Sequence, residues 1–302
     1  MWKQRMGVNG ILNVNKPGEC TSFSIVAKIR RITGEKRVGH AGTLDPAATG
    51  VLPICLGQAT RITEYLHAFS KQYVADIELG VSTDTFDGQG RVISCKDASS
   101  VTPSLLQQAL DSFRGTIDQV PPVYSAIKIK GRQAYSLARE GIKISLHPRQ
   151  VRIERMELLA FEPPYLKLSI LCSKGTYVRS LANDLGEKLG CGAYLKGLTR
   201  TAYGPFTIHD SHSPEEIQAA FETGRPQPLL YPVDYPLIDW QKMVLDEKTA
   251  LEVERGTDIV GPTADPSAGS LCRAYGPDER FIAIMKFRPE TGLWHPEKVF
   301  AL

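Results

Sequence analysis

The chain has 302 residues, of which 42% are hydrophobic and 23% are charged, with a formal net charge of +3. This composition is typical of an ordinary globular protein and argues against a disordered or fibrous chain. The longest charge-free stretch, residues 46–60, is too short to span a membrane, and the start of the chain has no signal-peptide pattern. The six cysteines lie far apart, without a CxxC pair or a histidine at zinc-ligand spacing. We therefore expect a cytoplasmic protein with reduced cysteines.

The first part of the chain predicts a strand, a helix and two further strands. Strand-like patterns occur at residues 10–17, 51–57 and 71–80. Residues 22–34 form an amphipathic pattern, in which Ser22 would cap a helix and Gly34 would end it. A loop rich in glycine, histidine and proline is expected over residues 37–48.

The central part continues the mixture of helices and strands. A helix is predicted from its cap at Thr102 to Gly115, just past its end. Two strands within residues 151–175 would turn at 162–164, and the next helix would end at Gly190. Because the strands come in hairpin-like pairs, the predicted fold class is α+β, with a mixed, largely antiparallel sheet flanked by helices.

A domain boundary is predicted near residues 226–236, where four prolines fall within eleven residues. Residues 237–302 hold eight Lys/Arg against eleven Asp/Glu, a balance of −3, so the rest of the chain carries about +6. A strand-like stretch at 281–287 and several turns suit a small β-rich module. We predict a large domain over residues 1–236 and a small one over 237–302.

Two segments of the large domain are strongly basic. Residues 1–37 and 121–155 each contain eight basic and two acidic side chains. Such clusters attract polyphosphate, but two solvated surface strips would have the same composition. Charge alone leaves both interpretations open.

A reactive pair of residue types, His40 and Asp45, lies in the loop before the predicted strand at 51–57. Loops held by a rigid strand often carry catalytic groups. From residue types and spacing alone, the simpler interpretation is that Asp45 caps the following turn and that His40 makes a structural hydrogen bond.

Residues 39–61, GHAGTLDPAATGVLPICLGQATR, resemble the signature of the TruB family of bacterial tRNA pseudouridine-55 synthases. Further segments resemble the family in the same order, at residues 10–23, 71–90, 121–141 and 173–206. The resemblance covers roughly residues 9–208. It implies a pseudouridine synthase fold and an enzyme that isomerises a uridine in the T-loop of tRNA.

This isomerisation breaks the N-glycosidic bond, turns the uracil and joins the ribose to ring carbon five. It involves no redox change and no activated donor, and the chain has no glycine-rich nucleotide-binding motif, so we expect neither a cofactor nor a metal. The resemblance implies that Asp45 is the catalytic carboxylate. Attack on the ribose, attack on the uracil ring and removal of a sugar proton all remain open for it.

The resemblance also implies two partners for Asp45 in catalysis. Arg179 would keep the desolvated carboxylate ionised through two parallel hydrogen bonds. Tyr73 would stack on the uracil and take part in proton transfer.

Four further residues are implied in substrate binding. His40 would contact the flipped nucleotide or its phosphate, while Tyr177 and Leu198 would line the uridine pocket. Lys16 would support the catalytic loop.

The target uridine must be flipped out of a folded RNA loop, at a cost that a basic surface can offset. We therefore expect an RNA-gripping insertion at about residues 121–150, and residues 237–302 resemble a PUA-type RNA-binding module. The expected partner is the T-arm of tRNA, bound by a monomer that needs no protein partner. The alternatives are an RNA-guided synthase, whose relatives tend to carry lysine-rich tails, and a tRNA-binding chaperone, which would not need residues such as Asp45 and Arg179.

Overall fold

The computed structural model describes residues 7–125, 127–129, 131–142, 144–261, 267 and 269–302. Within these residues the chain forms a ten-stranded sheet, a separate four-stranded sheet and two small hairpins, with helices packed around them. The α+β class predicted from the sequence is confirmed. Four cations of the two basic segments, Lys3, Arg5, Lys130 and Lys143, lie outside the described residues.

The large sheet has the strand order β14-β1-β3-β12-β4-β11-β10-β7. These strands are β1 (Gly10–Lys16), β3 (Thr49–Leu56), β4 (Lys71–Leu79), β7 (Gly115–Gln119), β10 (Arg149–Glu162), β11 (Tyr165–Cys172), β12 (Ala193–Tyr203) and β14 (Leu230–Tyr231). Two short strands join the path, β2 (Val38–His40) beside β3 and β13 (Phe206–Thr207) beside β12. The pairing of β12 with β3 is parallel, whereas the neighbouring pairs are antiparallel. The sheet is therefore mixed and largely antiparallel, as expected.

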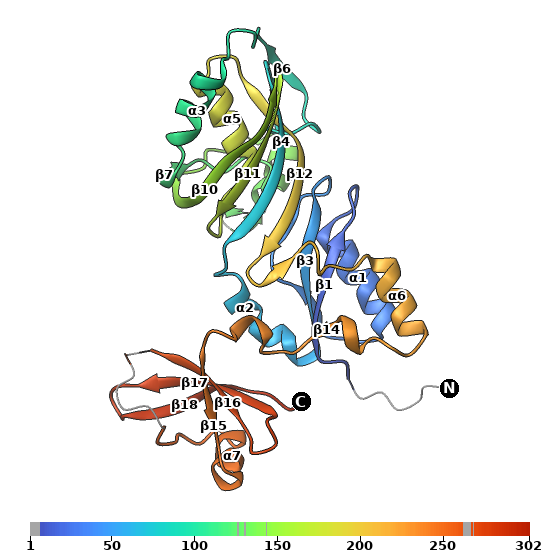
Figure 1. Cartoon of the computed structure of the whole chain (residues 1–302), viewed down its shortest axis with the longest axis vertical. Helices are drawn as coiled ribbons and strands as arrows, with labels where there is room; N and C mark the ends of the chain where they lie inside the picture. The colour runs from blue at the N-terminus through green and yellow to red at the C-terminus, as the bar shows by residue number, and fades with distance from the viewer. Residues whose placement is uncertain (1–6, 126, 130, 143, 262–266, 268) are drawn as a thin grey trace.

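Helices pack on both sheets, and those on the large sheet form two groups (Figure 1). Their bounds are α1 (Ser22–Thr33), α2 (Thr63–Leu66), α3 (Pro103–Asp111), α4 (Ala134–Arg139), α5 (Val178–Lys188), α6 (Pro214–Glu222) and α7 (Glu247–Glu254). In Figure 1, α3 and α5 lie together in the upper half, and α1 lies beside α6 in the lower half. Strands β4 and β12 run between the two halves, and the buried residues of β4 alternate along the strand, as expected for a sheet with one covered face.

Three local predictions need correction. Helix α1 is capped by Thr21, whose side chain accepts a hydrogen bond from the Ser24 amide, because Ser22 lies inside the first turn. Helix α3 ends at Asp111, and Gly115 opens β7 with a φ of 87°, which lets the chain turn back to pair with β10. The predicted loop at 37–48 contains β2, because its backbone pairs with β3.

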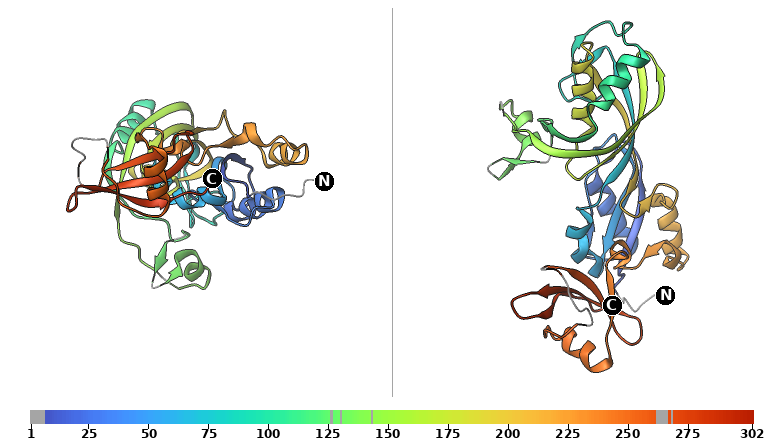
Figure 2. Two further views of the ribbon diagram at one scale, coloured as in Figure 1. Left: turned by 90° about the horizontal axis from the view of Figure 1, so that it is seen from below. Right: turned by 60° about the vertical axis from the view of Figure 1, so that its left-hand side comes forward.

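The segment after β7 departs from the body of the sheet. It holds a small hairpin of β8 (Lys128–Ile129) and β9 (Arg132–Gln133), followed by α4. The right-hand view of Figure 2 shows this green segment standing out to one side of the sheet. A second hairpin, of β5 (Val81–Thr83) and β6 (Val92–Cys95), lies at the top in Figure 1.

The end of the chain forms the four-stranded sheet. Its strands are β15 (Gln241–Val244), β16 (Leu271–Tyr275), β17 (Phe281–Arg288) and β18 (Leu293–Val299). Met243, Val253 and Trp294 belong to a core of its own, whereas Tyr275 and Phe300 join a cluster shared with the large sheet. An ion pair at 3.2 Å between Arg273 Nη1 and Asp234 Oδ2 also links the two parts.

Candidate active site

A cleft of about 1300 Å³ is lined by residues from both the upper and the lower half of the large sheet and its helices. Its walls come from the start of α1, the loop after β2, strand β4, the turn after β5, the start of α5 and the end of β12. The structure brings six of the seven predicted site residues to this cleft: His40, Asp45, Tyr73, Tyr177, Arg179 and Leu198. The seventh, Lys16, is fully buried and is not part of the lining.

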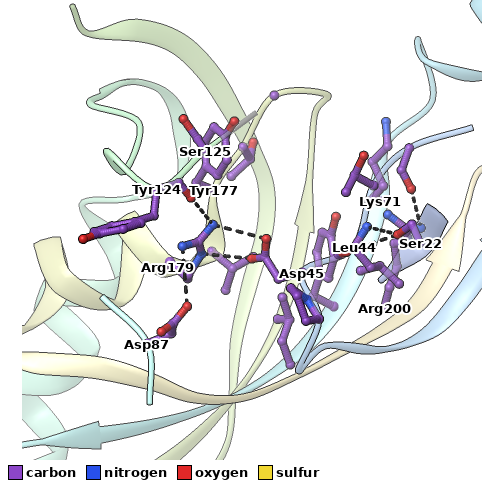
Figure 3. A pocket seen from close by; sticks show the side chains of 18 of the residues that line it. Ser22, Leu44, Asp45, Lys71, Asp87, Tyr124, Ser125, Tyr177, Arg179 and Arg200 are labelled. Carbon is purple, nitrogen blue, oxygen red and sulfur yellow. Dashed lines mark hydrogen bonds and ion pairs between the residues drawn. The ribbon is translucent and has the colours of Figure 1, made fainter. Parts of the chain in front are cut away.

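Asp45 and Arg179 form an ion pair in the cleft (Figure 3). Nη2 of Arg179 donates a hydrogen bond to Oδ1 at 3.2 Å, and Nε lies 2.9 Å from Oδ2, although its N–H is not aligned for a hydrogen bond. The pair thus has one hydrogen bond and one ionic contact, in place of the two hydrogen bonds expected. The arginine side chain is 6% exposed, whereas that of Asp45 is 42% exposed, which leaves the carboxylate open to a molecule entering the cleft.

Two other segments hold the guanidinium in place. Nη2 of Arg179 also donates to the backbone oxygen of Tyr124 at 3.0 Å, and Nη1 lies 3.5 Å from Oδ2 of Asp87. Neither contact was predicted from the sequence. The sequence offers one signal for Asp87: together with Asp84 it places two carboxylates in a short segment after the strand predicted at 71–80.

The surroundings of Asp45 raise the pKa of its carboxyl above the ordinary aspartate value. Burial is the largest cause, Arg179 opposes it, and the charge of Asp87 raises the pKa further. Arg179 therefore does not fully offset the cost of placing this charge in the cleft. The carboxylate is a stronger base than an ordinary aspartate, which suits proton abstraction and nucleophilic attack equally.

The loop carrying Asp45 is fixed on both sides of the residue. The buried Ser22 hydroxyl donates to the Leu44 backbone oxygen at 3.1 Å and accepts from the Leu44 amide at 2.9 Å. On the other side, Nζ of Lys16 donates to the backbone oxygens of Pro46 at 3.0 Å and Cys20 at 2.8 Å. Lys16 thus lies beneath the loop and ties it to the end of β1.

Two predicted residues have pKa shifts that fix their protonation. Burial raises the pKa of Tyr73, which is 8% exposed on β4, so its hydroxyl is protonated at neutral pH. Burial, followed by the charges of Arg200 and His67, lowers the pKa of His40. Nδ1 of His40 accepts a hydrogen bond from the Gly42 amide at 3.2 Å, which places the proton of the neutral ring on Nε2. His40 can therefore donate a hydrogen bond into the cleft without carrying a charge.

Tyr177 and Leu198 complete the predicted set. The backbone of Tyr177 is held by the buried Gln119, which accepts from its amide at 2.8 Å and donates to its oxygen at 3.0 Å. Its ring lies 4.7 Å from Cζ of Arg149. Leu198 is half-buried on β12 and packs against the main core, so it presents an apolar surface to the cleft.

Arg200 is a further cleft residue, which was not predicted from the sequence. It is 1% exposed, and it donates to the backbone oxygens of Val51 at 2.7 Å and Gly42 at 3.1 Å. Gly50 has a φ of 99°, and a Cβ atom there would lie 2.3 Å from the Arg200 backbone oxygen, so only glycine fits beside β12. No sequence signal pointed to Arg200, because its hydrogen bonds to Val51 and Gly42 end on backbone oxygens.

In the described part of the chain, no group of three His, Cys, Asp or Glu side chains is arranged to hold a metal ion. Among the described residues, no helix is both long and apolar enough to cross a membrane.

Comparisons with known proteins point to one family. The N-terminal domain of TruB family pseudouridylate synthase matches residues 30–178, and the tRNA pseudouridylate synthase B C-terminal domain matches residues 179–238. A tRNA pseudouridine synthase B from Dehalococcoides mccartyi is 45% identical over 295 residues, which is 97% of each chain. One from Clostridium tetani is 42% identical over 92% of this chain and 95% of the relative. Among solved structures, a chain of a Cbf5-Nop10-Gar1 complex matches with a TM-score of 0.76 and 26% identity, over 97% of this chain and 85% of that one.

Proposed function

The chain belongs to the TruB family of pseudouridylate synthases, and we propose that it isomerises a uridine in the T-loop of tRNA, with Asp45 as the reacting carboxylate. As a family member it is a pseudouridine synthase, an isomerase. The relatives named tRNA pseudouridine synthase B support tRNA as the substrate. The single observation that carries the role of Asp45 is its ion pair with Arg179, in a cleft that leaves the carboxylate exposed.

The reaction needs a group that acts at the sugar or at the uracil ring. The N1–C1′ bond breaks, the C5–C1′ bond forms, N1 gains a proton and C5 loses one, so no electrons are exchanged with a partner. Asp45 would attack C1′, attack the ring, or remove a sugar proton, and a raised pKa favours each of these. Arg179 would hold the carboxylate, and the protonated Tyr73 would lie against the uracil and pass a proton.

The other cleft residues would position the nucleotide. Tyr177 and Leu198 would pack against the uridine, and His40 would donate a hydrogen bond to the flipped nucleotide. Lys16 would act from beneath the loop, through Pro46.

We further propose that residues 1–236 form the catalytic domain and residues 237–302 a PUA-like RNA-binding domain. The separate core of the last sheet supports this division, and the shared cluster around Tyr275 and Phe300 supports a fixed orientation between the two. The segment of β8, β9 and α4 would grip the RNA, since it stands beside the cleft and contributes Gln133 and Tyr135 to its lining. We propose that a monomer acts on tRNA without a protein partner or a guide RNA.

The test uses purified protein and an unmodified tRNA transcript, without ATP, added metal or other proteins. We expect tritium release from a transcript labelled at C5 of uridine, and pseudouridine at the T-loop position after nuclease digestion. Asp45→Asn should bind the transcript and release no tritium. The proposal fails if the wild-type protein makes no pseudouridine in the T-loop, or if Asp45→Asn turns over at the wild-type rate.

A further inference from the structure

One wall of the cleft gathers three cations that the proposed chemistry does not use, Lys71, Lys174 and Arg200, beside the imidazoles of His40 and His67. We call it the cationic corner, and it consists of His40, His67, Lys71, Lys174 and Arg200. The five side chains come from different elements, yet the charges of Arg200 and His67 act on His40, and those of Lys71 and Lys174 act on His67. In Figure 3, Lys71 and Arg200 lie on the far side of Asp45 from Arg179.

The two buried cations of this corner, Lys71 and Arg200, have no counter-ion among the described residues. Lys71 is 9% exposed, and its Nζ donates to the backbone oxygens of Phe69 at 2.5 Å and His67 at 3.3 Å. Arg200 donates to the backbone oxygens of Val51 and Gly42, and its other polar neighbour is the neutral hydroxyl of Tyr73. No described carboxylate lies within 4.0 Å of either side chain, in contrast to Arg179, which has Asp45 and Asp87. Buried cations without a negative partner are costly, so their presence at a binding cleft calls for one.

Tyr203 compensates these charges only in part. Its ring centroid lies 4.4 Å from Nζ of Lys71 and 5.0 Å from Cζ of Arg200, so the ring faces two cations. Its own hydroxyl is buried in the cleft lining and has no hydrogen-bond partner among the described residues. Burial, followed by the charge of Arg200, lowers the pKa of Lys71 to about 8, as expected for an ammonium group with too little compensation.

We propose that the cationic corner binds one backbone phosphate of the RNA, next to the nucleotide held at Asp45, with Lys71 as its main ionic partner. This inference rests on the proposed function, which brings RNA into the cleft. A phosphate suits the corner because it carries a full charge and several acceptor oxygens, and RNA supplies one at every nucleotide. The exposed side chains of His67 and Lys174 form the rim through which the phosphate enters.

The first experiment measures the affinity for an unmodified tRNA transcript over a range of salt concentrations. We expect Lys71→Met to bind roughly tenfold more weakly at low salt, and the slope of log affinity against log salt to fall by about 1. Lys71→Arg keeps the charge and should retain most of the affinity. Lys188→Gln is the matched control, because Lys188 is an exposed lysine of α5 outside the cleft.

The stability of the protein without RNA distinguishes a role of Lys71 in RNA binding from a structural role. Lys71→Met replaces an uncompensated buried ion by an apolar chain of similar length, so its melting temperature without RNA should match the wild type within a few degrees. If this variant does not fold, Lys174→Gln carries the test, since its side chain is an exposed cation of the corner. Lys174→Gln should lower the salt slope, and an unchanged slope would overturn the proposal.

The second experiment locates the phosphate. Neutral methylphosphonate linkages are placed singly on either side of the target uridine, and one of them should weaken binding by the wild type but not by Lys71→Met. Equal losses of affinity for the wild type and for Lys71→Met at every linkage would overturn the inference. So would an RNA affinity that Lys71→Met leaves unchanged, even if inorganic phosphate binds to the cationic corner. Absence of pseudouridine with the wild type would instead refute the proposed function, so the two failures are distinguishable.

Discussion

Oδ2 of Asp87 lies 3.5 Å from Nη1 of Arg179, so a second carboxylate shares the guanidinium that pairs with Asp45. The guanidinium of Arg179 is thereby held from two sides, and it in turn fixes the position of the Asp45 carboxylate. The charge of Asp87 also raises the pKa of Asp45. Asp87 therefore acts on the carboxylate through geometry and through charge.

Asp87→Asn should lower the single-turnover rate of pseudouridine formation while leaving RNA affinity within about twofold of the wild type. Loss of the second anchor lets Arg179 shift, and misplacement of a catalytic group by about 1 Å can cost roughly 100-fold in rate. Single-turnover kinetics with excess enzyme measures the effect. Asp84→Asn is the matched control, because this carboxylate of the same turn pairs with Arg91 instead. Equal rates for Asp87→Asn and the wild type would refute the anchoring role.

Arg179→Lys should not behave as a conservative change. A lysine ammonium is a single point charge that cannot reach Asp45, Asp87 and the Tyr124 backbone oxygen together. We expect the rate to fall by about 100-fold or more, the range seen when a fixed electrostatic partner of a catalytic group is lost. Arg91→Lys, at an exposed ion pair of the neighbouring turn, serves as the control and should keep its activity. A similar loss in both variants would point to unfolding of the turn, which circular dichroism would detect.

The pH dependence of the rate follows from the raised pKa of Asp45. In each proposed route the carboxylate reacts in its ionised form, so the rate should fall as the pH falls through this pKa. The midpoint of the acid limb of the pH–rate profile should therefore lie above the ordinary aspartate pKa of about 3.9. Because the charge of Asp87 raises the pKa, Asp87→Asn should move the limb to lower pH. A limb that stays in place or moves to higher pH would contradict the assigned electrostatics.

Local patterns predicted most of the elements around the site. The strands at β1, β3 and β4 follow from apolar runs and alternation, and Gly34 ends α1 in the left-handed conformation expected of a helix stop. The end of α3 was placed too late, because the register of β7 against β10, set far along the chain, decides where the helix must stop. Strand β2 was missed for the same reason, since its pairing with β3 is a tertiary contact.

The site itself was predictable only where a motif carried it. Asp45 and Arg179 lie 134 positions apart, and nothing in local spacing joins them, so their pairing came from the family resemblance. Contacts that the resemblance did not imply were missed, among them those of Asp87 and the Tyr124 backbone oxygen with Arg179. Arg200 was missed because its partners are backbone oxygens, which leave no mark in a sequence.

Ser22 illustrates the same limit and leads to a further prediction. Its type and position predict a helix cap, yet Thr21 makes the cap and the Ser22 hydroxyl bonds both backbone groups of Leu44, the residue before Asp45. Because Ser22 is 1% exposed, no solvent can replace these bonds when the hydroxyl is removed. Ser22→Ala should therefore destabilise the protein by about 1–3 kcal/mol, the cost of leaving buried backbone groups unsatisfied.

The functional effect of Ser22→Ala should exceed its effect on RNA binding. A loosened Leu44 lets the carboxylate of Asp45 sample positions away from Arg179, so the single-turnover rate should fall several-fold while the affinity for the transcript changes little. Ser24→Ala, which removes an exposed hydroxyl that donates to the Thr21 backbone oxygen, is the matched control and should cost well under 1 kcal/mol. Thermal unfolding and single-turnover kinetics of both variants provide the measurement. If Ser22→Ala and Ser24→Ala lose stability and rate to the same extent, the Ser22–Leu44 contact does not hold the catalytic loop, and the position of Asp45 must then depend on Lys16 and Arg179 alone.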